Sequence, residues 1–381
     1  MNLTTYPWIP VVWNDGRADL VSLREVFERG HEIRDLAVRP HERIALMRLL
    51  VCVAQAALDG PADYADWLTC RDRIPPAALD YLGQWKPAFE LFGDGQRFLQ
   101  VADLKPMSAA DDGEGSSTSK LDLALATGNN TTVFDNAGGT DREFTPAQLA
   151  LALLAFQCFS PGGRIGVARW RGTLTVGEGS SNHAPCLPGG MLHGILRGNS
   201  LLETVHLNVL SKDSVEMFVP HGAWGRPIWE RKPSSSGDAA AVTNATQTYL
   251  GRLVPLTRAA CLDGERNAMT LANGLDYPAF PDWREPTATI VVRERNGQPE
   301  RVVMNASLDK APWRELHALA VKRIGQDTNG GVVALQNLSC DRAFDLWVGG
   351  LVADKAKLVD AMEAVFHVPA GMLTELCQHA Y

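Results

Sequence analysis

The 381-residue chain contains no run of about 18 uncharged apolar residues, so no segment is expected to span a membrane. The strongest candidate, residues 44–58, is short and contains Arg48 and Gln55, which favours a buried helix. The opening MNLTTYPWIPVVWNDG lacks the basic segment and cleavage site of a secretory signal peptide. These absences predict a cytoplasmic protein without a membrane partner.

Clustered metal-binding residues are missing as well. The seven cysteines are spread along the chain, with no zinc knuckle, ribbon or CxxC redox pair. Several lie in apolar surroundings such as LLVCVAQ, so we expect reduced cysteines in the core. The nine histidines form no HExxH motif and no cluster with cysteine. We therefore expect no metal, no cofactor and no catalytic residues.

A basic excess is also missing. The sequence has 36 Lys and Arg against 44 Asp and Glu, a formal net charge of −8 at pH 7. A free-standing nucleic-acid binder is usually basic, because much of its affinity comes from releasing counterions at phosphates. A role with nucleic acid would therefore need a local basic patch or basic partner subunits.

The residues that are present predict a globular protein, since 45% are hydrophobic and 21% are charged. Ser22 begins a capping box that predicts a helix over residues 23–29, ended by a left-handed Gly30. Thr145 begins a second capping box, before a helix that ends at the Pro-Gly-Gly sequence. Residues 40–58 predict a helix that is apolar nearly all round and hence buried.

Strand signals occur at both ends of the chain. Residues 8–13 predict a strand, and Asn-Gly at 296–297 between two β-rich runs predicts a hairpin. Residues 344–348 predict another strand before a Gly-Gly pair, and residues 313–324 an amphipathic helix. The low-complexity segment 107–120 is expected to be mobile.

The segment FSPGGRIGVARWRG, residues 159–172, permits three interpretations. It lacks the GxxxxGK[ST] and GxGxxG patterns of phosphate loops, and it follows a helix rather than preceding one. The first, a nucleotide- or small-molecule-dependent enzyme using residues 160–172, therefore stays only as an alternative. The second is a solvated glycine loop. The third is a basic loop that approaches nucleic acid, with arginines for phosphates and Trp170 for stacking.

Several segments, taken in order, resemble one family. The start MNLTTYPWIPV, followed by SLREVF, resembles the beginning of the large subunit of Cascade, often called CasA. Cascade is the type I-E CRISPR surveillance complex. The similarity runs almost from end to end through the segments LMRLLVCVAQ, FLQV, GNNTTVFDN, SPGG, LLETVHLNVL, YLGRLVPLTR, ANGL and FDLWVGG.

The resemblance implies an α+β fold, with a large mixed domain of helices and small antiparallel sheets over residues 1–365. The family continues into a C-terminal bundle of four helices. Residues 366–381 are expected to be the start of that region, with the bundle truncated or supplied by another chain.

The resemblance also implies a binding subunit that is not an enzyme. Relatives read the protospacer-adjacent motif (PAM) in double-stranded DNA from the minor groove and help to open the duplex. They also present a surface to the helicase-nuclease. The implied partners are target DNA, the CRISPR guide RNA, the other Cascade subunits and that effector. A glycine loop suits the minor groove because it lets the backbone approach closely.

The implied site residues fall in two groups. The family's guide-RNA docking motif corresponds to Phe134, Asp135 and Asn136. The DNA-contacting group comprises Gly162, Gly163, Arg164, Gly166, Arg169, Arg171, Arg266, Asn267, Asp354 and Lys355.

Two members of the second group depart from the family pattern. Asp354 and Lys355 stand where relatives have an asparagine that reads the motif and a glutamine that wedges the strands apart. The aspartate would repel phosphates, whereas the lysine would attract them.

Overall fold

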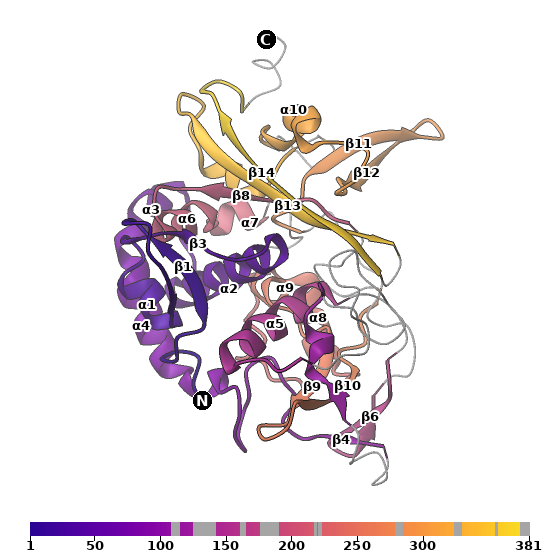
Figure 1. The fold of residues 1–381 in the computed structure, drawn as a ribbon. Coiled ribbons are helices and arrows are strands. Elements are labelled where there is room, and N and C mark those ends of the chain that lie inside the picture. Colours follow the sequence, from indigo (N-terminus) through magenta and orange to yellow (C-terminus); the bar gives the residue numbers. More distant parts are fainter. Residues whose placement is uncertain are drawn as a thin grey trace.

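The structure is a computed structural model that describes residues 1–107, 115–124, 142–160, 165–175, 190–216, 219, 223–278, 285–323, 330–354 and 357–373. Within these ranges, helices combine with small antiparallel sheets (Figure 1), so the predicted α+β class is confirmed.

The helices include one long central helix and several short ones. The α-helices are α1 (Leu23–Glu28), α2 (Pro40–Leu58), α3 (Tyr64–Thr69), α4 (Ile74–Gln84), α5 (Pro146–Phe159), α6 (Leu201–Asn208), α7 (Lys212–Glu216), α8 (Ala239–Gln247), α9 (Tyr249–Leu253) and α10 (Leu316–Leu319). The 3-10 helices are η1 (Cys70–Arg73), η2 (Lys86–Phe89), η4 (Thr118–Leu121), η8 (Pro312–Glu315) and η9 (Val333–Asn337).

The strands pair into sheets of two or three, with the orders β2-β1-β3, β5-β10-β9, β11-β12, β14-β13-β8 and β4-β6-β7. They are β1 (Ile9–Trp13), β2 (Ala18–Val21), β3 (Ile33–Leu36), β4 (Leu104–Pro106), β5 (Ser116–Ser117), β6 (Ala168–Trp170), β7 (Thr173–Leu174), β8 (His193–Arg197), β9 (Arg258–Leu262), β10 (Ala268–Asn273), β11 (Ile290–Arg295), β12 (Gln298–Val303), β13 (Phe344–Asp354) and β14 (Lys357–Val368).

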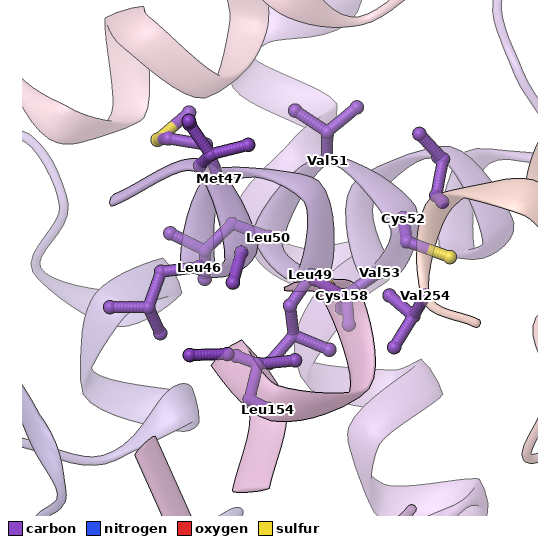
Figure 2. Close-up of a cluster of buried hydrophobic side chains, with 14 of the residues drawn as sticks. Leu46, Met47, Leu49, Leu50, Val51, Cys52, Val53, Leu154, Cys158 and Val254 are labelled. Atoms are coloured by element: carbon purple, nitrogen blue, oxygen red, sulfur yellow. The ribbon is translucent and has the colours of Figure 1, made fainter. Parts of the chain in front are cut away.

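Helix α2 is the centre of the hydrophobic core. It packs against α4, α5, α6, α9 and β13, and its apolar side chains are buried on all sides. Figure 2 shows its leucines and valines packed with Leu154 and Cys158 of α5 and with Val254. A helix that is apolar all round has no face for water, which explains why the other elements surround it.

Arg48 of α2 and two charged side chains packed beside this helix are buried together. The Arg48 guanidinium donates from Nε to the Leu253 carbonyl at 2.8 Å and from Nη2 to the Arg252 carbonyl at 2.7 Å. Its Nη1 forms an ion pair with Glu285, and Arg252 Nε donates to the second Glu285 oxygen at 3.1 Å. Glu285 is completely inaccessible to water. We call Arg48, Arg252 and Glu285 the buried ion triad.

The triad determines the charge state of Glu285. Burial alone would raise the pKa of this carboxyl, but the charges of Arg48 and Arg252 outweigh burial and hold that pKa well below its usual value. Glu285 also accepts a hydrogen bond from Thr287 Oγ1 at 2.8 Å, and Thr287 contacts the buried His193 ring at 2.8 Å. The triad thus connects α2 and α9 to the segment that precedes β11.

Both predicted capping boxes are confirmed. Ser22 Oγ accepts from the Glu25 amide at 3.2 Å, and Thr145 Oγ1 accepts from the Gln148 amide at 3.3 Å. The prediction that Gly30 adopts a left-handed conformation is wrong, because its φ is not positive. A Cβ there would meet the Val26 carbonyl oxygen at 2.4 Å, so this glycine allows close packing rather than a reversed backbone.

The hairpin at 296–297 is confirmed as β11–β12, with positive φ at both turn residues. Other expectations need correction. In place of the continuous helix expected over 313–324, the described residues up to 323 form only η8 and the one-turn α10. In the segment 107–120, residues 116–120 form β5 and part of η4, which pack against α5 and β10. The cysteines include the exposed Cys340 as well as core residues.

The strand predicted at 344–348 continues through the Gly-Gly pair to Asp354 and pairs with β14 over its full length. A Cβ on Gly350 would meet the Met191 carbonyl oxygen at 2.6 Å, so packing explains this glycine. The boundary expected between residues 365 and 366 falls inside β14. The division into a large domain and a C-terminal helical region stays a prediction, and residues 374–381 lie outside the described ranges.

In the part of the chain that the structure describes, no helix is both long enough and apolar enough to cross a bilayer.

The buried ion triad predicts a large effect of Glu285→Gln. Removing the charge leaves two buried guanidinium groups uncompensated, so the free energy of unfolding should fall by about 3–5 kcal/mol. The low pKa of Glu285 stabilises the fold above its unfolded pKa, and this contribution is lost as pH falls through the folded pKa. Denaturant titrations from pH 7 down to pH 3 should therefore show a steeper decline for the parent chain than for the variant.

The matched control is Glu300→Gln, which removes an exposed ion pair with Arg295 at 3.2 Å. An exposed pair contributes at most about 1 kcal/mol, so the control should change little. Equal effects of the two substitutions would contradict a central role for the triad.

Candidate nucleic-acid interface

The segment 165–175 forms a hairpin rather than an irregular loop. Arg171 and Gly172 have φ values of +50° and +83° and connect β6 to β7 in a two-residue turn. Positive φ at both central positions is the geometry of a type I′ turn, which matches the twist of antiparallel strands. In the sequence, only the Arg-Gly pair indicates this turn, and Arg-Gly predicts a hairpin less strongly than Asn-Gly does.

The strand alternation of β6 sends neighbouring side chains to opposite faces. Arg169 is exposed, whereas Ala168 and Trp170 are each 2% exposed. Trp170 therefore belongs to the core beneath the hairpin. The stacking role predicted for Trp170 is wrong, because its ring is not available to a base.

Gly166 lies just before this hairpin and is exposed. A Cβ at this position would meet only the Leu271 carbonyl oxygen, at 3.9 Å, and φ is not in the left-handed region. Neither packing nor backbone geometry requires a glycine there. This contrasts with Gly172, whose positive φ the turn requires.

Two of the predicted arginines have acidic partners. Arg171 Nε donates to Asp103 at 2.7 Å, and Arg266 Nε donates to Asp263 at 2.7 Å. A hydrogen bond from the Glu265 amide, followed by the contact with Arg266, lowers the pKa of the Asp263 carboxyl. Both arginines are exposed, so these pairs are weak and water-screened.

Asn267 is mainly part of the local structure. Its Nδ2 donates to the Arg142 carbonyl at 2.7 Å, and its Oδ1 accepts from Thr118 Oγ1. These bonds connect the start of β10 to η4, and the side chain is half-buried. Of the neighbouring pair predicted to contact DNA, Arg266 is therefore the more accessible.

The structure brings several predicted residues to one region. Strand β10 packs against β4 and β6, and Gly166 approaches Leu271 on β10. The hairpins β6–β7 and β9–β10 therefore carry Gly166, Arg169, Arg171 and Arg266 on neighbouring elements, away from the helices α1 and α4 (Figure 1).

The other predicted site residues are not placed. Asp354 ends β13, and its side chain is not described. Outside the described ranges lie Gly162, Gly163, Arg164, Lys355, Phe134, Asp135 and Asn136.

One exposed cation in this region was missed by the sequence interpretation. Lys105 lies on β4 directly opposite Arg169 on β6. This strand has only three residues, one of them a proline, so the sequence is too short to show the alternation of buried and exposed side chains. The pairing between β4 and β6 crosses more than sixty residues of sequence, and only the fold shows it.

The enzymatic alternative finds no support in these elements. Residues 165–175 lead into strand β6 and not into a helix, so no helix N-terminus there offers amides to a phosphate. Among the residues that the structure describes, no group of His, Cys, Asp and Glu could hold a metal ion.

Comparison with known proteins places this chain among CRISPR-associated proteins. The chain belongs to the family described as CRISPR-associated protein Cse1, which matches residues 2–380. The family expected from the ordered sequence segments is thereby confirmed.

Individual relatives agree with this assignment. The chain is 31% identical to CRISPR-associated protein CasA/Cse1 of Thermus thermophilus over 400 residues, covering 98% of this chain and 72% of that protein. A solved structure of Thermus thermophilus CasA (Cse1) is similar with a TM-score of 0.72 at 25% identity, covering 100% and 79% of the two chains. A chain in a CRISPR RNA-guided surveillance complex has the same fold, with a TM-score of 0.73 at 19% identity over 97% and 76%.

The buried position of Trp170 predicts that Trp170→Ala acts on stability. Loss of a buried aromatic ring should lower the free energy of unfolding by about 3–5 kcal/mol. Chemical denaturation measures this. Thr173→Ala, on the exposed cross-strand partner, should stay within about 0.5 kcal/mol of the parent chain. An unchanged stability of Trp170→Ala combined with weaker DNA binding would restore the stacking interpretation.

Proposed function

We propose that the chain is the DNA-recognition subunit of an RNA-guided CRISPR surveillance complex and that it reads the PAM in double-stranded DNA. The observation that carries this proposal is the exposed basic hairpin β6–β7, preceded by a glycine that the fold itself does not require. Membership of the Cse1 family supports it. A chain with this fold occurs in a structure of such a complex.

The physical argument concerns how closely the backbone can approach DNA. The minor groove shows a degenerate pattern of acceptors, so its readers use shape, backbone approach and a few polar groups. Gly166 has no side chain to hold the chain away from a groove, and Gly162 and Gly163 precede it in sequence. Arg169 and Arg171 follow on the hairpin and would contact the phosphates that border the groove.

The net charge of −8 fits a subunit that does not bind DNA alone. In a complex that carries guide RNA, partner subunits would neutralise most phosphates, and this chain would add a local reading surface. In this proposal Phe134, Asp135 and Asn136 dock the chain near the guide RNA. The chain also recruits the helicase-nuclease and has no catalytic site of its own.

The remaining part of the proposal concerns strand separation. Asp354 and Lys355 lie where the β13 and β14 sequences meet, at the positions that relatives use to read the motif and wedge the duplex. A lysine at the wedge position would be attracted to the separating strands, whereas the neighbouring aspartate would discourage close phosphate approach.

The glycine assignment predicts the effect of Gly166→Val. Because a Cβ has space at this position, the variant should fold with an unchanged melting temperature. A branched side chain between backbone and groove should nevertheless weaken PAM-duplex binding by the assembled complex about tenfold or more, equal to about 1.4 kcal/mol.

Gly83→Val is the matched control, since Gly83 on α4 also has open space around it. It should leave both stability and DNA affinity unchanged. Normal affinity of the Gly166→Val complex would remove the basis for a glycine contact with DNA.

The wedge assignment predicts that Lys355→Ala slows duplex opening more than it weakens initial docking. Fluorescent base analogues beside the PAM measure opening, and filter binding measures docking. On a duplex opened beforehand by mismatches, the variant and the parent complex should behave alike. Equal losses on closed and pre-opened duplexes would contradict a wedge.

A further inference from the structure

The small sheet β4-β6-β7 has one buried and one exposed face. On the buried face lie Leu104, Ala168 and Trp170. On the exposed face, Lys105 pairs with Arg169 across β4 and β6, and Arg169 pairs with Leu174 across β6 and β7. We call Lys105 and Arg169 the cross-strand basic pair.

Two like charges directly opposite each other are unfavourable in a sheet. Their Cβ atoms are about 4.5–5.5 Å apart at paired positions, and like charges there destabilise the pairing. Among the described residues, neither side chain forms an ion pair, and the hydrogen bond of Arg169 is a long one of 3.4 Å to the Gly172 carbonyl. The pair therefore forms a local excess of positive charge on the exposed face of the sheet.

In the described part of the chain, no carboxylate forms an ion pair with either side chain. Asp103, the acidic residue directly before β4, instead binds Arg171 through Oδ2 at 2.7 Å. The three positive charges of Lys105, Arg169 and Arg171 and the one negative charge of Asp103 give this surface a net charge of +2, whereas the whole chain has a net charge of −8. An exposed sheet surface with this charge balance favours a polyanion with regularly spaced charges.

We propose that the cross-strand basic pair of Lys105 and Arg169 binds successive phosphates of the target DNA duplex and positions it without reading its sequence. The inference rests on the proposed function, because Arg169 lies on β6, three residues after the glycine that would enter the groove, and Lys105 lies on the neighbouring strand β4. It assigns a role to Lys105, and it separates the role of Gly166 from the role of the cross-strand basic pair. Gly166 approaches the bases, whereas Lys105 and Arg169 hold the backbone.

The division of roles follows from the chemistry of each group. Contacts to phosphate oxygens determine register and orientation but carry no direct sequence information. A lysine acts as a point charge, and the planar guanidinium of arginine can donate two parallel hydrogen bonds to one phosphate. The duplex would relieve the repulsion between the two side chains when it binds.

The test uses the complete surveillance complex with guide RNA, carrying the parent chain, Lys105→Ala, Arg169→Ala or both substitutions. Affinity for a short duplex is measured from 50 to 300 mM salt, with a favourable and an unfavourable motif. Each lost phosphate contact should make the plot of log K against log salt shallower by about 1, so the double variant should lose about 2. The ratio of affinities for the two motifs should stay unchanged.

Lys105→Glu distinguishes this role from a structural one. It creates an opposite-charge pair with Arg169, so the melting temperature of the isolated chain should not fall, while DNA binding should weaken more than in Lys105→Ala. Lys105→Arg should retain the parent salt slope. Arg71→Ala combined with Lys86→Ala removes two exposed positive charges from the helical side and should leave the slope unchanged.

The outcomes separate the two proposals. An unchanged salt slope in the double variant, with normal motif discrimination by the parent complex, would overturn the basic pair alone. Loss of motif discrimination in the double variant would overturn the division of roles. A parent complex that shows no discrimination would overturn the proposed function and this inference with it.

Discussion

The buried ion triad of Arg48, Arg252 and Glu285 is the interaction on which the rest of the structure depends. The core helix α2 is apolar, and Arg48 is among its few charged residues. Its guanidinium cannot lie in that core without partners, because a buried uncompensated charge costs several kcal/mol. The carbonyls of Arg252 and Leu253 and the carboxylate of Glu285 supply them. Three segments that are distant in sequence are thereby held at one point.

This arrangement leaves the periphery free to carry function. The small sheets have two or three strands each, and sheets such as β2-β1-β3 and β4-β6-β7 contribute buried side chains to the hydrophobic core. Trp170 illustrates the division, since its ring anchors β6 while Arg169 beside it faces solvent. Lys105 and Arg169 are therefore held on short strands whose neighbouring side chains, Leu104 and Trp170, are buried. A reading surface requires support from packed side chains of this kind.

Local signals predicted local structure well. The capping boxes at Ser22 and Thr145, the helix over 40–58 and the turn at 296–297 depend on neighbouring residues, and all four are confirmed. The errors arose where distant packing decides. A glycine is needed at position 30 because Val26 and Leu202 leave no space for a Cβ, and not because the backbone reverses there. The sequence 313–324 has a helical period, yet its described residues, 313–323, form only one α-helical turn.

The same distinction between local signals and distant packing applies to the candidate site. The order of motifs along the chain was enough to recognise the family, because that information is one-dimensional, and the low count of basic residues already required a local patch. Which side of a strand each residue faces was not determined by the sequence at β4 and β6, since strands of three residues have no readable period. Only the tertiary structure buried Trp170 and set Lys105 opposite Arg169. Strand pairing between distant segments is decided by how apolar faces meet in the core.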